Sequence, residues 1–379
     1  MRSHRWLVLG SHIPASGRLG GMIRYTVEVL RALSERPDVD VLVHCRAETV
    51  PFLVDELGLL TTDLRPTATG STIVDSLMER HRLGRLLDEV RPRVVLGTKQ
   101  LLPSRAPGSV RVLTVHDLLP FDRPHDFGVG KRRLLPPAYR RSILDADVLA
   151  CVSDATRNRL VERFPTVSDR ARTIGNAMTS GLLAIDPEPI PDLEGGPPFA
   201  LVVGDRSGRK NLGYVLDLWP EVVARRPDAR LALVGPPGWG RNERLPGLDR
   251  LLADGVAVEL GMISDARLRW AYGRAMVTLC PSRLEGFGLP VLEALNLGCP
   301  VVLSTDPAQV EAAGGRGTPV DLADRRGWIE AVVDHLDGRR PVPPAPTMRA
   351  WTDVAAELVD AADEVMARQA EPAVARGVG

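Results

Sequence analysis

The sequence predicts a parallel α/β protein made of two doubly wound domains. Short runs rich in valine and leucine alternate with helical patterns along most of the chain. Nearly continuous apolar strands with helices between them indicate parallel sheets that are covered on both faces. A proline-rich stretch, residues 181–198, interrupts this alternation and is expected to be an interdomain linker. At 379 residues the chain is long enough for two domains of ordinary size.

The first domain is predicted over residues 1–180. Its expected strands are the apolar runs 5–10, 39–45, 93–97, 110–115 and 147–152. Its helices are expected at roughly 22–34, 133–145 and 154–164, where apolar residues recur at helical spacing.

The second domain is predicted over residues 199–348. Its expected strands are 199–204, 229–235, 256–260, 275–280 and 300–304, and its expected helices are 211–225, 264–274 and 289–297. A second proline-rich segment, 341–347, precedes the C-terminal segment 349–379, in which an amphipathic helix is expected near 351–368.

Composition limits the class of protein. The formal net charge is 0, so there is no global electrostatic case for nucleic acid as a partner. The four cysteines lie far apart without a CxxC pair, which is typical of free thiols in a reducing compartment rather than of disulfides or zinc. No stretch has the pattern of a signal peptide or a membrane span. We therefore expect a cytoplasmic protein, with a monomer and a homodimer both left open.

One stretch of the second domain combines acids and glycines in a suggestive order. Glu285 and Glu293 flank a glycine turn that follows the buried strand 275–280 and opens the helix 289–297. Gly286 and Gly288 let the backbone approach a ligand, and amides at a helix N-terminus attract anions such as phosphate. Taken singly, each feature is equally consistent with an ordinary helix start, because an acid there interacts favourably with the helix dipole.

The run from Glu285 to Glu293 resembles the E-x7-E element of retaining glycosyltransferases of family 4, also called group 1. The resemblance extends over residues 260–304 and implies the GT-B fold. In that fold two Rossmann-like domains face each other across a cleft, the first expected to bind the acceptor and the second the nucleotide sugar. A C-terminal helix crosses back to the N-domain. The implied reaction moves a sugar from a nucleoside diphosphate donor, most simply a UDP- or GDP-sugar, to an acceptor hydroxyl, in the synthesis of a bacterial glycan, a glycolipid or a secondary metabolite.

The resemblance also implies roles for the residues of this stretch. Glu285 is expected to contact hydroxyls of the donor sugar, and Glu293 the ribose of the nucleotide. The turn residues between them are expected to line the donor site: Gly286, Phe287, Gly288 and Leu289. The base is expected to meet backbone near Met262. No metal or other cofactor is expected, because cations and helix amides can stabilise the departing diphosphate.

A basic loop after the strand 199–204 is expected to supply those cations. Lys210 falls at the position of a lysine in the family, and it is one of only three lysines among 48 basic residues. The partner arginine of the family usually lies five residues earlier, where this chain has Asp205. Arg206 and Arg209 are the candidate substitutes. We expect Arg206, because Arg209 adjoins Lys210 and neighbouring side chains diverge; a solvated basic loop is the alternative.

The first domain contributes further candidates. His116 ends the strand 110–115, and in similar segments of the family this histidine lies near the donor sugar, although a lone histidine is often structural. Gly20 and Gly21 belong to a glycine-rich loop expected to cover the donor phosphates. Trp351, in the C-terminal helix, is expected to be a packing residue. The segment 131–144 interleaves five cations with apolar residues, which favours either a solvated face or a peripheral membrane contact.

The expected chemistry is transfer with retention. No carboxylate stands out as a nucleophile for double displacement, so we expect attack on the same face as the leaving phosphate, which acts as base. A nucleotide-sugar epimerase or hydrolase, and a non-catalytic nucleotide-sugar-binding subunit, are the alternatives.

Overall fold

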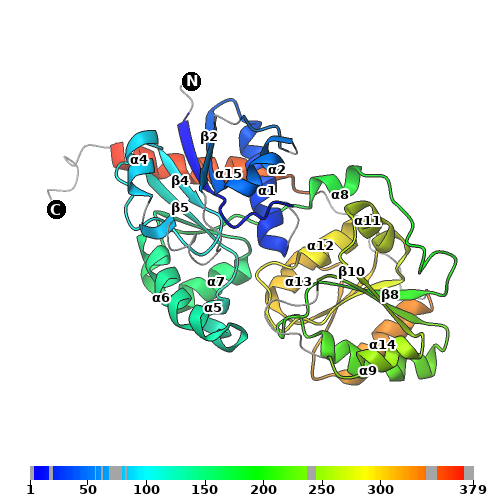
Figure 1. The fold of residues 1–379 in the computed structure, drawn as a ribbon. Coiled ribbons are helices and arrows are strands. Elements are labelled where there is room, and N and C mark those ends of the chain that lie inside the picture. The colour runs from blue at the N-terminus through cyan, green and yellow to red at the C-terminus, as the bar shows by residue number, and fades with distance from the viewer. Residues whose placement is uncertain are drawn as a thin grey trace. The chain divides into compact units, whose positions relative to one another are not determined.

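The computed structural model describes residues 4–16, 20–55, 57–60, 63–67, 79–81, 83–236, 245–338 and 348–370. They form two compact units (Figure 1). The first unit runs to Pro124, resumes over Val129–Ala177 and includes the C-terminal segment from Ala350. The second unit comprises His125–Gly128 and Met178–Arg349.

The first unit is built on a parallel sheet whose described strands have the order β3-β2-β1-β4-β5-β6-β7. The strands are β1 (His4–Leu9), β2 (Val39–Arg46), β3 (Leu64–Thr67), β4 (Val94–Gly97), β5 (Val110–Val115), β6 (Val148–Cys151) and β7 (Ala171–Thr173). Most side chains of β1, β2, β4, β5 and β6 are apolar and buried, as both faces of a covered parallel sheet require, whereas in the edge strands β3 and β7 only Leu64 and Ala171 are buried.

Helices cover both faces of this sheet. They are α1 (Gly20–Ser34), α2 (Val50–Asp55), α4 (Gly84–Val90), α5 (Leu119–Asp122), α6 (Val129–Asp145) and α7 (Asp154–Arg163), with short 3₁₀ turns at Ala47–Thr49, Pro124–Asp126 and Pro165–Val167. The long C-terminal helix α15 (Trp351–Ala370) packs beside α1 and against β5 and β6 (Figure 1). The chain thus returns to the first unit after completing the second.

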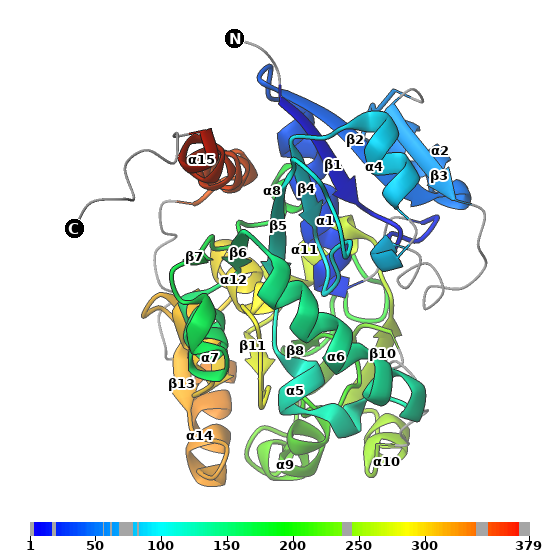
Figure 2. The same cartoon turned by 90° about the vertical axis from the view of Figure 1, so that its left-hand side faces the viewer.

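The second unit contains a parallel sheet with the order β10-β9-β8-β11-β12-β13. The strands are β8 (Phe199–Val203), β9 (Arg230–Val234), β10 (Ala257–Gly261), β11 (Val277–Cys280), β12 (Val301–Ser304) and β13 (Thr318–Val320). The helices are α8 (Ser180–Ala184), α9 (Leu212–Arg225), α10 (Leu248–Ala253), α11 (Asp265–Arg274), α12 (Leu289–Asn296), α13 (Pro307–Ala313) and α14 (Arg325–Leu336). Helices α9 and α14 lie side by side on one face (Figure 2), and α8, α11, α12 and α13 pack on the other.

The prediction of two doubly wound α/β domains is confirmed. The predicted and observed strands differ mainly at the edges of the two sheets. The strands that sequence reasoning missed are β3, β7 and β13, each of which lies at an edge of its sheet. They are short, and two of them contain a proline, which edge strands tolerate because one side of the strand needs no ladder hydrogen bonds. Helix α6 runs through Pro136 and Pro137 without ending, where a shorter helix was expected.

The segment 181–198, expected to be a linker, belongs to the second unit. Leu182, Ile190 and Leu193 are buried in the core of that unit, against Phe199 and Tyr272. These apolar residues are spaced irregularly between prolines, so neither a helical nor a strand pattern revealed their burial. The second proline-rich segment, 341–347, lies outside the described residues.

Candidate functional site

In open parallel sheets, ligands bind at the carboxyl ends of the strands where the strand order reverses. In the second unit this point lies between β8 and β11. A pocket opens there, lined by Val202, Val203, Gly204, Asp205, Lys210, Leu212, Leu279, Cys280, Pro281, Ser282, Glu285, Gly288, Pro290, Val291 and Gln309. The sheet topology and the pocket therefore both indicate the loops after β8 and β11, which are the loops that the sequence predicts to bind the donor.

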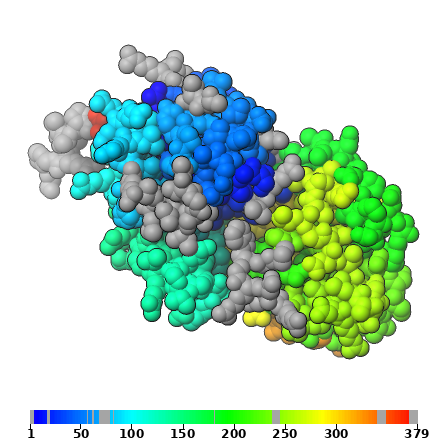
Figure 3. Space-filling view, viewed as in Figure 1, coloured from blue at the N-terminus to red at the C-terminus, as the bar shows by residue number. Residues whose placement is uncertain are grey.

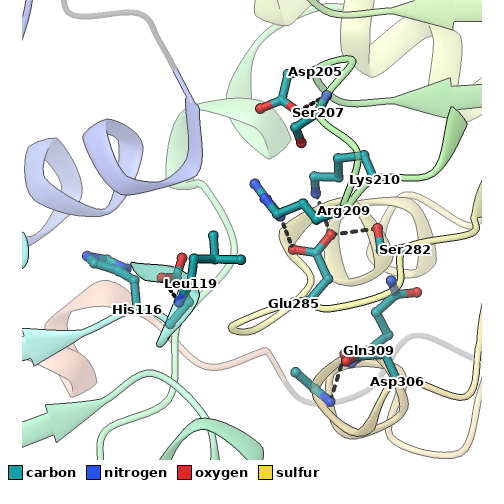
Figure 4. A network of polar contacts seen from close by, with 12 residues as sticks. His116, Leu119, Asp205, Ser207, Arg209, Lys210, Ser282, Glu285, Asp306 and Gln309 are labelled. Atoms are coloured by element: carbon teal, nitrogen blue, oxygen red, sulfur yellow. Dashed lines mark hydrogen bonds and ion pairs between the residues drawn. The ribbon is translucent and has the colours of Figure 1, made fainter. Parts of the chain in front are cut away.

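Three side chains converge on the carboxylate of Glu285 in this pocket (Figure 4). Lys210 Nζ lies 2.6 Å from Glu285 Oε1, and Arg209 Nη1 lies 2.8 Å from Oε2. The hydroxyl of Ser282 also donates to Oε1, at 2.7 Å. Both carboxylate oxygens are thus held by a cation, and the side chain of Glu285 is only 8% exposed.

These contacts fix the charge state of Glu285. Burial of the carboxyl would raise its pKa, but Lys210 and Arg209 outweigh burial and hold the pKa at about 2. The group is therefore a carboxylate at every physiological pH. An acid with so low a pKa is a weak base, and a carboxylate bound by two cations is a weak nucleophile.

The expectation that Arg206 is the partner arginine of Lys210 is corrected by this geometry. Arg206 forms an ion pair with Glu259 instead, and Arg209 takes the position beside Lys210. The reason is local: the amide of Lys210 donates to the carbonyl of Ser207 at 2.9 Å, so these residues form a turn. Neighbouring side chains alternate in an extended strand but not in a turn, so Arg209 and Lys210 both reach Glu285.

Backbone contacts join the two loops of the site. The amide of Arg283 donates to the carbonyl of Arg209 at 2.8 Å, and the side-chain amide of Asn211 donates to the carbonyl of Pro281. Asn211 adopts a left-handed conformation, with φ 55°, which asparagine tolerates better than most residues. The cations and the carboxylate are therefore carried by one connected backbone framework.

The glycine turn before α12 requires glycine. Gly288 has φ 106°, a conformation that residues with a side chain rarely adopt, while a Cβ there would meet Gln309 Cα and Ala312 Cβ of α13 at an ordinary contact distance of 3.5 Å. Gly288 forms the N-cap of α12, so the N-terminus of that helix faces the pocket that Gly288 lines. Gly286, Phe287 and Leu289 belong to the same turn, and Phe287 packs on the core instead of lining the pocket.

Glu293 lies one turn into α12 and is almost completely buried, at 2% exposed. Thr179 donates to its Oε1 and Tyr272 donates to its Oε2, both at 3.2 Å. It does not line the pocket in which Glu285 lies. The structure thus separates the two acids of the motif, with one at the pocket wall and one behind it.

Sequence reasoning missed two polar residues of this pocket, Ser282 and Gln309. Ser282 orients Glu285, and its carbonyl accepts a hydrogen bond from Ser304 at 2.6 Å. Gln309 is held at the start of α13 by the side chain of Asp306, which caps that helix. Gln309 is distant in sequence from the motif, so only the position of α13 beside the glycine turn reveals it.

In the first unit, His116 follows β5 and has a defined tautomer. Its Nε2 lies 2.9 Å from the carbonyl oxygen of Thr98, which can only accept, so Nε2 carries the proton. Burial lowers the pKa of His116 to about 4, so the ring is neutral at pH 7 and Nδ1 carries a lone pair. This histidine can accept a hydrogen bond from a ligand hydroxyl at Nδ1.

A buried polar cluster lies at the carboxyl ends of β1, β2 and β4 in the same unit. Lys99 Nζ lies 3.1 Å from Glu79 Oε2 and donates to Ser11 Oγ at 3.2 Å. His44 Nδ1 lies 3.3 Å from Glu79 Oε1, and burial together with Lys99 lowers the pKa of the nearby His12 to about 3. The rarity of lysine is the one sequence signal that points to Lys99.

The remaining predicted site residues lie away from these contacts. Gly20 and Gly21 form the exposed start of α1, while residues 17–19 of the predicted loop lie outside the described residues. Met262 is 63% exposed, directly after β10. Neither position lines the pocket of the second unit.

Among the described residues, no group of three or more histidine, cysteine, aspartate or glutamate side chains is arranged to hold a metal ion. None of the described helices combines the length and apolar character needed to cross a bilayer.

Comparisons with known proteins agree with this arrangement. Residues 19–179 match the model of "Glycosyltransferase Family 4", and residues 188–320 match that of "Glycosyl transferases group 1". The O-antigen chain mannosyltransferase B of Escherichia coli is 28% identical, over 85% of this chain and 87% of the relative. A GDP-mannose-dependent phosphatidylinositol monomannoside mannosyltransferase of Mycolicibacterium smegmatis is 28% identical, over 60% of this chain and 63% of the relative.

Solved structures share the fold. Anabaena Alr3699/HepE, crystallised with UDP and glucose, superposes with a TM-score of 0.66 over 97% of this chain and 99% of that chain, at 16% identity. The family of the chain follows from both family models, and its fold from the two parallel sheets and the superposition. It belongs to the family 4 (group 1) glycosyltransferases and is a glycosyltransferase of GT-B fold.

Proposed function

We propose that this glycosyltransferase moves a hexose from a nucleoside diphosphate sugar to an acceptor hydroxyl, with retention of configuration, in the synthesis of a bacterial glycan or glycolipid. The observation that carries the proposal is the cluster of Lys210, Arg209 and Glu285 at the switch point of the second sheet. GDP-mannose is the first donor to test, because the proteins similar to this chain include mannosyltransferases, one of them GDP-mannose-dependent. A UDP-sugar is the second.

The charge of the cluster suits a diphosphate. Within the cluster, two cations and one carboxylate leave one positive charge beside the N-terminus of α12. The carboxylate of Asp205, which accepts a hydrogen bond from the amide of Ser207, also lines this pocket. A diphosphate placed there would meet Lys210, Arg209 and the positive end of the helix dipole. In this proposal Glu285 holds both cations in place and offers its outer lone pairs to hydroxyls of the donor sugar. Glu293 would reach the ribose only by giving up a contact with Thr179 or Tyr272, which hold its two carboxylate oxygens.

The proposed reaction breaks the bond between the anomeric carbon and the phosphate oxygen and forms a bond from that carbon to the acceptor oxygen. The electron pair of the broken bond stays on the diphosphate, where Lys210 and Arg209 stabilise it. The acceptor proton passes to the departing phosphate oxygen on the same face. Support for same-face attack comes from Glu285, whose two cations make it a weak nucleophile for double displacement.

His116 has a separate role in this proposal. Because Nε2–H is committed to the carbonyl of Thr98, Nδ1 accepts a hydrogen bond from a sugar hydroxyl and does not donate one. A neutral histidine in this position orients a hydroxyl without adding charge beside the reacting carbon.

One helix of the first unit, the unit proposed to bind the acceptor, has features that favour contact with a membrane surface. Helix α6 lies at the surface (Figure 3) and exposes five cations, Lys131, Arg132, Arg133, Arg140 and Arg141. None of them forms an ion pair with another described residue.

Two apolar side chains of the same helix, Val129 and Leu134, are 72% and 54% exposed. We propose that this helix docks on anionic lipid. Co-sedimentation with vesicles rich in phosphatidylglycerol, lost in an Arg132→Glu/Arg133→Glu variant and absent with phosphatidylcholine, would support docking. Equal sedimentation of both proteins would contradict it.

The function is tested by a donor screen followed by a transfer assay. Ligands that bind only the folded protein raise its melting temperature, so GDP-, UDP- and dTDP-sugars are compared for thermal stabilisation. The stabilising donor is then incubated with lipid-linked and free oligosaccharide acceptors, and the anomeric configuration of the product is read by NMR. Release of a free or epimerised sugar without transfer would favour a hydrolase or epimerase, and binding without turnover would favour a non-catalytic subunit.

A further inference from the structure

Three aromatic rings of the first unit, those of Trp351, Tyr25 and His116, follow one another in edge-to-face contact. We call this row of rings the stack. Tyr25, in α1, lies between the other two. Its ring centroid is 4.8 Å from that of His116 at an interplanar angle of 89°, and 5.5 Å from that of Trp351 at 76°. Both contacts are edge-to-face, an arrangement that aromatic rings prefer.

The middle ring of the stack is held firmly. Tyr25 is completely buried, and its hydroxyl lies 3.3 Å from Thr114 Oγ1, within β5. Strand β5 also leads directly into His116, so Tyr25 is attached to the segment that carries the histidine. Displacing the tyrosine ring would therefore disturb both its hydroxyl contact and its contact with the imidazole.

The outer ring comes from the C-terminal helix. Trp351 is the first residue of α15, directly after the chain re-enters the first unit at Ala350. The indole is buried, and its Nε1–H has no hydrogen-bond partner among the described residues. A buried donor without a partner is unfavourable, so the contribution of this side chain lies in its ring packing and not in its N–H group.

Building on the proposed role of His116, we propose that Tyr25 and Trp351 are positioning residues that fix the plane of the His116 ring. The hydrogen bond from Nε2 to Thr98 restrains one edge of the imidazole, but the terminal torsion of histidine is broad. The wall formed by Tyr25, backed by Trp351, removes that freedom. The Nδ1 lone pair then has a single direction, toward the hydroxyl that it is proposed to accept.

The experiment compares four variants of the full chain. Trp351→Leu and Tyr25→Leu remove the wall, while Trp351→Phe keeps an aromatic ring and also removes the unpartnered N–H. Val354→Ala is the matched control, because Val354 is buried on the same helix but takes no part in the stack. Histidine ring ¹⁵N spectra, with the His116 signal assigned by its loss in His116→Ala, report the tautomer and the exchange of this ring.

We expect the two leucine variants to broaden or shift the His116 ring signals and to lower kcat about 10- to 100-fold with little change in the donor KM, since small displacements of a positioning group have effects of that size. Trp351→Phe should retain the native signals and most of kcat. Val354→Ala should lower Tm without changing the His116 signals. Two leucine variants are included so that failure of one to fold leaves the other to decide.

The outcomes separate this inference from the proposed function. Native His116 signals in a folded leucine variant would overturn the positioning role, whatever the enzyme transfers. Altered signals with unchanged transfer would support the positioning role and overturn the part assigned to His116 in the reaction. If the native protein transfers no sugar, the spectra still decide whether the wall holds the ring.

Discussion

The substitution Glu285→Gln removes the charge at the centre of the proposed donor site while keeping the shape of the side chain and an oxygen for Ser282. The pKa of Glu285 is about 2 in the folded protein, compared with an ordinary value of 4.5. At 1.36 kcal/mol per pKa unit, this difference corresponds to about 3 kcal/mol of folding stability at pH 7. The side chain is 8% exposed, so screening by solvent removes little of that.

The sign of the pH dependence follows from the lowered pKa. A carboxyl group whose pKa is lower in the folded state stabilises the protein above its unfolded pKa, and this stabilisation is lost as pH falls toward the folded value. The difference in unfolding free energy between the native protein and Glu285→Gln should therefore stay near 3 kcal/mol from pH 8 to about 5. It should shrink as pH falls from about 4.5 toward about 2.

The assay must report on the second unit separately, because two units need not unfold together. Equilibrium urea unfolding read by pulsed hydrogen exchange does this, with peptides of β8, β9 and β11 reporting on the second unit. Peptides of β4 and β5 report on the first unit and serve as an internal control. A difference below 1 kcal/mol at pH 7, or one that grows as pH falls to 4, would refute the assignment of Glu285 as a carboxylate held by two cations.

Four further predictions concern the same loops. Lys210→Met should lower kcat about 10²- to 10³-fold in a steady-state transfer assay, because one of the groups that stabilise the departing diphosphate is lost; a change under threefold would remove Lys210 from that role. Arg209→Met should weaken binding of the nucleoside diphosphate at least about tenfold in calorimetry. Arg206→Met should leave the affinity for the nucleoside diphosphate unchanged, since the partner of Arg206, Glu259, lies on the surface. An equal loss of affinity in both arginine variants would instead indicate a basic loop without a specific partner for Lys210. Gly288→Ala should destabilise the second unit by about 1–2 kcal/mol in urea, because its φ is 106°. Transfer should survive excess EDTA and show no gain with Mg²⁺ or Mn²⁺, if cations of the protein suffice for the diphosphate.

The fold was predictable because buried parallel strands leave a strong pattern. Runs such as 199–203 and 148–151 are apolar without interruption, and each is followed by a loop and a helical pattern. The edge strands β3, β7 and β13 escaped prediction because one of their sides needs no partner, so short and proline-containing segments suffice.

The loops that form the candidate site were predictable as far as contiguous motifs reach. The loop with Glu285 and the loop with Lys210 were identified from sequence, and the structure brings them within 2.6 Å of each other. The choice between Arg206 and Arg209 failed because it assumed extended backbone, whereas a turn directs both Arg209 and Lys210 to one carboxylate.

Contacts that depend on tertiary packing left no local signal. Gln309 reaches the pocket only because α13 packs on the glycine turn, and the stack of His116, Tyr25 and Trp351 joins three segments distant in sequence. Neither is encoded in a motif of neighbouring residues, so only the folded chain reveals them.

The central claim is that the loops after β8 and β11 hold the diphosphate of a nucleotide sugar. It is tested most directly by isothermal titration of GDP and UDP into the native protein, Lys210→Met and Arg206→Met. We expect one of the two nucleotides to bind the native protein and Arg206→Met with the same affinity, and to bind Lys210→Met at least about tenfold more weakly. Equal affinity for all three proteins, or no binding of either nucleotide, would contradict it.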